Sequence, residues 1–88
     1  MEMRLEHIVE EVKFYIINHN YEEAKRLLES ALKKFPENEE LLYHLGILYE
    51  LMFNEEEAVR IYRKILELYP SGKRARDVVE KLKKLGEI

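Results

Sequence analysis

The stretch that decides the fold runs from residue 42 to residue 70 and reads LYHLGILYELMFNEEEAVRIYRKILELYP. It contains a Leu-Gly pair that ends at Gly46, a small residue at Ala58, an aromatic residue at Tyr62 and a closing proline at Pro70. This order and spacing are typical of a helix–turn–helix repeat. We therefore expect two helices here, and we expect the neighbouring parts of the chain to stack on them.

Outside this stretch the apolar residues also follow helix spacing. From Leu5 to Ile16 and from Ala24 to Phe35 they recur at intervals of three and four residues, which predicts two amphipathic helices. Residues 73–86 predict a fifth helix with one narrow apolar stripe and a glycine at its end. Pro36 and Pro70 are expected to end the second and fourth helices, because proline lacks a backbone donor and restricts the residue before it.

Asparagines are expected to cap three of the helices at their N-termini. Asn20 and Asn54 are each followed by a glutamate three residues later, which is the pattern of a capping box. Asn38 is expected to cap the third helix. The segment from Leu41 to Phe53 is apolar on almost every side, and this predicts a helix that is buried between its neighbours.

The chain matches itself when it is shifted by one period, so that Tyr15 falls on Tyr49. The same shift pairs Asn20 with Asn54, Ala24 with Ala58, Leu32 with Leu66, and Pro36 with Pro70. The chain therefore resembles the tetratricopeptide repeat family in its period of about 34 residues. It is also similar to the family in having two helices per unit and in the motif residues of its second unit, namely Leu42, Leu45, Gly46, Tyr49, Ala58, Tyr62 and Pro70. The first unit departs from the family pattern, with Glu11 and Val12 in place of the Leu-Gly pair.

The resemblance implies an all-α fold, a right-handed superhelical stack of helix–turn–helix units with five helices in a single domain. Repeat one is expected at about residues 5–38, repeat two at about 39–72 and a capping helix at about 73–86. A polar outer face on such a helix solves the problem that a stacked repeat cannot bury its last apolar face alone.

Members of this family mostly bind proteins or peptides in a groove lined by the first helices of the units. The resemblance therefore implies a protein–protein interaction module, an adaptor or scaffold that binds a peptide or a helix of a partner protein. Carried onto this sequence, the expected binding residues are Val9, Lys13, Tyr43, His44, Ile47, Arg74, Asp77 and Lys81, with Glu6, Glu10 and Glu40 beside them on the groove wall.

Two apolar residues of the third helix have an ambiguous position. Tyr43 and Ile47 lie off the stripe that marks the core side of this helix. They are either exposed anchors for a partner or core residues packed under the neighbouring helices, and the sequence leaves both interpretations open. The family's groove for a C-terminal carboxylate is not expected, because only Arg74 matches it in character.

The charge distribution suggests an alternative function. Residues 1–72 carry nine basic and fifteen acidic side chains, net −6, whereas residues 73–88 carry six basic and three acidic side chains, net +3. This asymmetry favours head-to-tail self-association or an oppositely charged partner, unless the cations simply complement a helix C-terminus. Phe14 and Ile17 lie off the apolar stripe of the first helix. The alternative is therefore a self-associating structural module, a homodimer or higher homo-oligomer without a peptide ligand.

Several classes of function are not expected from this sequence. There is no cysteine, and His7, His19 and His44 share no ligand spacing, so we expect no metal site and no cofactor. The sequence contains no phosphate-binding loop and no nucleophile motif, so we expect no enzyme. The net charge of −3 argues against a nucleic-acid partner.

The chain is also expected to act away from membranes. Its apolar runs are too short to cross a bilayer, and residues 1–4 do not begin an apolar signal core. We therefore expect a cytoplasmic protein. Glutamate and lysine are abundant, as they are in heat-adapted proteins, which favours a thermostable one.

Overall fold

The computed structural model describes residues 4–88, and these residues form five α-helices and no strand. The helices are α1 (Leu5–Ile17), α2 (Tyr21–Lys34), α3 (Glu39–Leu51), α4 (Glu55–Leu68) and α5 (Ala75–Lys84). The prediction of an all-α fold with five helices is confirmed. Residues 1–3, on which the expected lack of a signal core partly depends, lie outside the described part of the chain.

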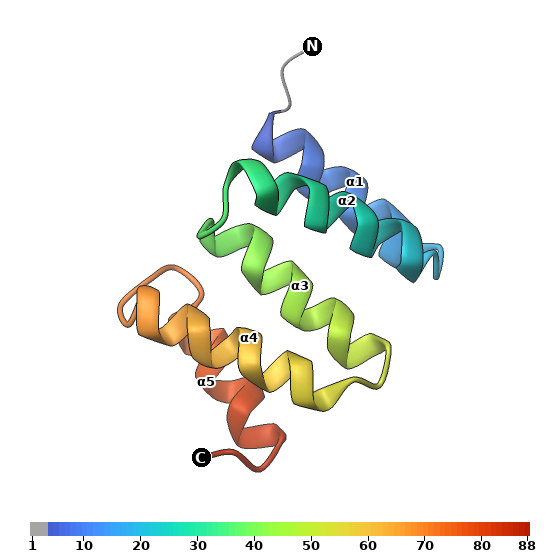
Figure 1. Ribbon diagram of the computed structural model, residues 1–88. Helices are drawn as coiled ribbons and strands as arrows, with labels where there is room; N and C mark the ends of the chain where they lie inside the picture. Colours follow the sequence, from blue (N-terminus) through green and yellow to red (C-terminus); the bar gives the residue numbers. More distant parts are fainter. Residues whose placement is uncertain (1–3) are drawn as a thin grey trace.

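The helices are stacked in the order of the chain (Figure 1). α1 and α2 form one antiparallel pair, α3 and α4 form the next, and α5 follows, so that α1 and α5 lie at opposite ends of the stack. Each helix packs against the next one in the sequence, and α1 also contacts α3. Contacts of this kind, mainly between neighbouring units, define a helical-repeat stack.

α3 lies in the middle of the stack and supplies much of the core. Its buried residues are Leu41, Leu42, Tyr43, His44, Leu45, Gly46 and Leu48, which confirms the prediction of a helix buried between neighbours. The expectation is wrong for Phe53, because α3 ends at Leu51 and the side chain of Phe53 is 93% exposed. The chain reverses direction here, and Phe53 has a φ of 59°, which turns its side chain outward.

α3 and α4 approach each other most closely where Gly46 faces Tyr62. A Cβ atom at Gly46 would lie 2.8 Å from Cδ1 of the Tyr62 ring and closer still to Cε1. The first unit fills the equivalent space differently, with Val12 and Leu28, which are also fully buried. A glycine and a large aromatic residue in one unit thus replace two medium-sized aliphatic residues in the other.

Two of the three expected asparagine caps form. The side chains of Asn38 and Asn54 accept hydrogen bonds from the backbone N–H three residues later, at 3.0 and 3.3 Å. Asn20 makes no such bond, so the prediction that its side chain caps α2 is wrong. Neither expected capping box is completed, since Glu23 pairs with Arg26 and Glu57 pairs with Arg60, each one turn later, instead of reaching back to the asparagine.

The helix C-termini lie where the prolines and Gly86 predict them. α2 and α4 each end two residues before a proline, at Lys34 and Leu68. α5 begins at Ala75, two residues later than expected, because the residues after Pro70 form a turn. Gly86 follows α5 with a φ of +78°, the left-handed conformation that commonly ends a helix.

Candidate functional site

The candidate site is the surface shared by α1, α3 and α5, which we call the α1–α3–α5 face. Two open pockets lie on it. The α1–α3 pocket has a volume of about 370 Å³ and is lined by Leu5, Glu6, Val9, Glu10, Lys13, Asn38 and Glu40. The α3–α5 pocket has a volume of about 410 Å³ and is lined by Tyr43, Asp77, Glu80, Lys81 and Lys84. Five of the eight expected binding residues line these pockets, namely Val9, Lys13, Tyr43, Asp77 and Lys81, and Arg74 and His44 each bond to Glu40 at the α1–α3 pocket.

Arg74 joins α5 to α3 at this face. Its Nε atom lies 2.5 Å from one carboxylate oxygen of Glu40, and Nη2 lies 3.0 Å from the other. The guanidinium carbon lies 4.4 Å from the centroid of the Tyr43 ring, which adds a cation–π contact. The bond to Arg74 holds the pKa of Glu40 below its usual value of 4.5. Arg74 is therefore engaged within the chain.

Tyr43 and His44 are core residues in the structure. Tyr43 is 7% exposed and lies beneath the guanidinium of Arg74, and His44 is 5% exposed. The imidazole Nδ1 of His44 donates to the backbone carbonyl of Glu40 at 2.8 Å, and burial lowers the pKa of the imidazole below 6.5. The interpretation of Tyr43 as an exposed anchor is thus corrected, and so is the placement of His44 on the open groove wall.

Ile47 remains available on the same helix. It is partly exposed while its side chain packs against the core. It differs in this from Tyr43, whose ring lies 4.4 Å from the guanidinium carbon of Arg74.

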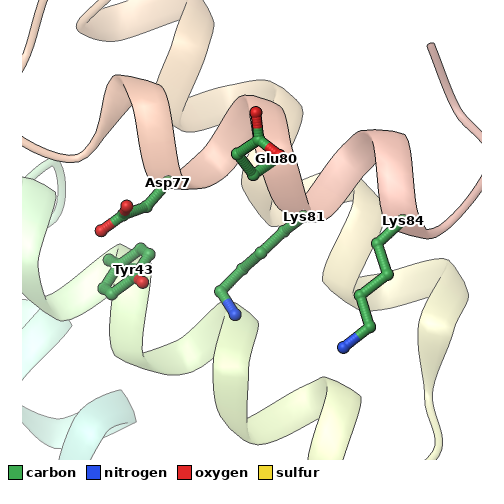
Figure 2. Close-up of a pocket in the computed structure, with 5 residues that line it drawn as sticks. All are labelled: Tyr43, Asp77, Glu80, Lys81 and Lys84. Atoms are coloured by element: carbon green, nitrogen blue, oxygen red, sulfur yellow. The ribbon is translucent and has the colours of Figure 1, made fainter.

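The α3–α5 pocket has a mixed charge. Figure 2 shows Lys81 and Lys84 extending from α5 on the same side, whereas Glu80 points the other way. The Lys81 ammonium lies 3.9 Å from a carboxylate oxygen of Glu50, which also accepts the Tyr62 hydroxyl. Burial together with this hydrogen bond raises the pKa of Tyr62. Among residues 4–88, no ion pair uses Lys84.

The structure adds residues that sequence reasoning missed. Glu50 and Lys84 were not among the expected binding residues, and Glu40 was expected on the groove wall without a role. The spacing offered a signal for Glu40, since Glu40 and Arg74 are one repeat period apart and so hold equivalent positions on successive first helices. No comparable signal marked Glu50, whose contacts come from α4 and α5.

The described residues contain no arrangement that suggests metal chemistry. Within residues 4–88 there is no group of three or more His, Cys, Asp or Glu side chains that could hold a metal ion. None of the helices described has the length and apolar character needed to span a membrane.

The fold and the α1–α3–α5 face define the chain as a helical-repeat protein. A family model for the tetratricopeptide repeat matches residues 15–82, and the chain belongs to this family. Repeats of this family are generally protein–protein interaction modules. The chain is similar to a TPR repeat-containing protein of Methanocaldococcus jannaschii, with 37% identity over 51 residues. The match covers 58% of this chain and 16% of that relative, and no solved structure matches the chain significantly.

Proposed function

We propose that the chain is an adaptor module that binds a peptide segment of a partner protein along the α1–α3–α5 face. The proposal is supported by one observation above all, the presence on this face of open pockets on both sides of α3. The apolar residues Leu5 and Val9 are part of the lining of the α1–α3 pocket, and Ile47 adds a partly exposed apolar side chain on α3. Apolar surface of this kind, rimmed by charged groups, is typical of a peptide groove.

The charged rim supports specificity more than affinity. Exposed ion pairs contribute little energy, whereas their pattern selects one partner over another. The buried position of Tyr43 moves the expected anchoring role to Ile47, Val9 and the stem of Lys13. Asp77 and Lys81 then contact the part of the ligand that lies over the α3–α5 pocket.

The test uses peptides selected from a displayed library of short random sequences, with the full chain as the target. Binding of the selected peptides is measured by fluorescence polarisation to the wild-type protein and to Ile47→Asn. Val59→Asn is the matched control, because Val59 is a partly exposed apolar residue on α4, away from this face. Circular dichroism confirms that both variants remain helical.

We expect Ile47→Asn to weaken binding at least tenfold and Val59→Asn to change it less than twofold. Peptides that bind both variants equally would show that the ligand lies elsewhere. If no selected peptide lost affinity on Ile47→Asn, the proposed function would be contradicted.

A second candidate function is self-association through the outer side of α1. Phe14 and Ile17 are 61% and 75% exposed, and they continue a row of residues spaced by three and four that begins at His7 and includes Glu10. Of this row, Phe14 and Ile17 are the apolar members, and exposed apolar side chains three residues apart on one helix suit a contact with a second copy. Sedimentation velocity tests this directly. If two copies associate, the apparent molecular mass should increase with protein concentration, and Phe14→Glu should abolish this increase. A wild-type protein that stays monomeric at all concentrations would contradict self-association.

A further inference from the structure

We propose that the α1–α3 pocket binds a basic side chain of the partner segment, an arginine or a lysine. This inference rests on the proposed function, since it names the chemistry of one ligand position on the same face. The argument comes from the repeat itself, because the neighbouring seam between α3 and α5 already holds an arginine that belongs to the chain.

The seam between α3 and α5 shows how the scaffold holds a guanidinium. Glu40 accepts two hydrogen bonds from Arg74, and the ring of Tyr43 supports the guanidinium from below. A forked carboxylate–guanidinium pair over an apolar floor is a strong and directional arrangement. It needs two elements from the first helix of a unit, a carboxylate and an apolar residue one turn later.

The α1–α3 pocket has a carboxylate and an apolar residue at the equivalent positions, but this apolar residue is aliphatic and provides packing without a cation–π contact. A shift of one repeat period toward the N-terminus carries Glu40 onto Glu6 and Tyr43 onto Val9, and both Glu6 and Val9 line this pocket. The third member of the arrangement differs, because the same shift carries Arg74 onto Glu40. A second carboxylate therefore stands where the neighbouring seam has its cation.

The charge around this pocket is unbalanced as a result. Glu6, Glu10 and Glu40 line it, and the cation among its lining residues is Lys13. Glu40 is paired with Arg74, whereas no ion pair within residues 4–88 uses Glu6 or Glu10. Carboxylates that share one site repel each other, and a cation placed between them relieves that repulsion.

The apolar part of the pocket lining suits the rest of such a side chain. Leu5 and Val9 are partly buried apolar residues of this lining. The methylene stem of an arginine or lysine packs on apolar surface while its charged end stays at the rim. The side chain would then lie along Val9 and present its charge to Glu6 and Glu10, as Arg74 lies on Tyr43 and reaches Glu40.

The experiment uses the library-selected peptides and the full chain. Glu6→Gln combined with Glu10→Gln removes the two carboxylates that α1 contributes to this pocket. Glu22→Gln combined with Glu29→Gln is the matched control, because both of these glutamates are exposed on α2. In each peptide, every basic residue is replaced in turn by alanine, and each peptide is measured against all three proteins.

We expect one basic position to recur among the peptides that depend on Ile47. Its replacement by alanine should weaken binding to the wild type and to the α2 control at least tenfold, and binding to the Glu6/Glu10 variant less than twofold. Peptides that depend on Ile47 but contain no recurring basic residue would overturn this inference and leave the proposed function intact. The inference would also be overturned if replacing the recurring basic residue by alanine weakened binding equally to all three proteins. Absence of any peptide that depends on Ile47 would instead remove the proposed function and the inference with it.

Discussion

Replacing Gly46 with alanine is expected to destabilise the protein although alanine favours helices. The added Cβ atom would lie 2.8 Å from Cδ1 of Tyr62 and closer to Cε1, which real contacts do not tolerate. The ring has little freedom to move, because Tyr62 is fully buried and its hydroxyl donates to Glu50. The backbones of α3 and α4 must therefore separate to accept the methyl group.

The size of the effect follows from two opposing contributions. Overpacking a rigid core site costs about 1–3 kcal/mol, and the locked ring places this site toward the upper end. Alanine gains about 1 kcal/mol over glycine inside a helix. We expect the free energy of unfolding to fall by about 1–2 kcal/mol, which lowers the Tm by roughly 4–16 °C in a domain of this size.

The measurement is urea unfolding followed by circular dichroism, in the wild type and in a Tyr62→Leu background. Leucine is the residue that the first unit holds at the equivalent position, Leu28. With the ring gone, Gly46→Ala should become neutral or stabilise the protein by up to about 1 kcal/mol, so the two substitutions should couple by about 1–3 kcal/mol. An equal cost in both backgrounds, or a more stable single variant, would refute the steric argument.

Three further predictions concern other parts of the structure. Burial lowers the pKa of His44 below 6.5 and Arg74 lowers that of Glu40 below 4.5, so both groups bind protons more readily when unfolded. The free energy of unfolding should therefore decrease as the pH falls from 7 toward 4, and His44→Val should flatten the upper part of that curve in urea titrations. Arg74→Lys keeps the charge but loses the fork, which should cost about 1–2 kcal/mol and speed amide hydrogen exchange in α5 more than in α3. Uniform acceleration would contradict this localised role. Phe53→Asn should raise the Tm, with a gain of up to about 1 kcal/mol, because asparagine tolerates the φ of 59° better than phenylalanine; a lower Tm would show that the exposed ring makes a stabilising contact.

The helices and their order follow from local features that the sequence displays directly. Apolar spacing, prolines and asparagine caps act within one or two turns of backbone, so α2 and α4 end just before their prolines as expected. The misplaced residues, Asn20 and Phe53, lie at turns. At Phe53 a positive φ turns the side chain outward, which a periodic pattern does not display. Nothing in the structure explains why Asn20 makes no cap bond while Asn54, in the equivalent turn, makes one.

By itself, the sequence determined the repeat, the family and the helices that carry the α1–α3–α5 face. It also located the Leu-Gly pair and Ala58 as scaffold, because a fixed repeat period places equivalent side chains at equivalent sites. Only the tertiary structure decided which residues of that face are accessible. Tyr43 is covered by Arg74, a side chain that arrives from another helix, whereas Ile47 is left partly open. The reason is physical, since helix period depends on the local backbone whereas exposure depends on the reach and charge of side chains on neighbouring helices.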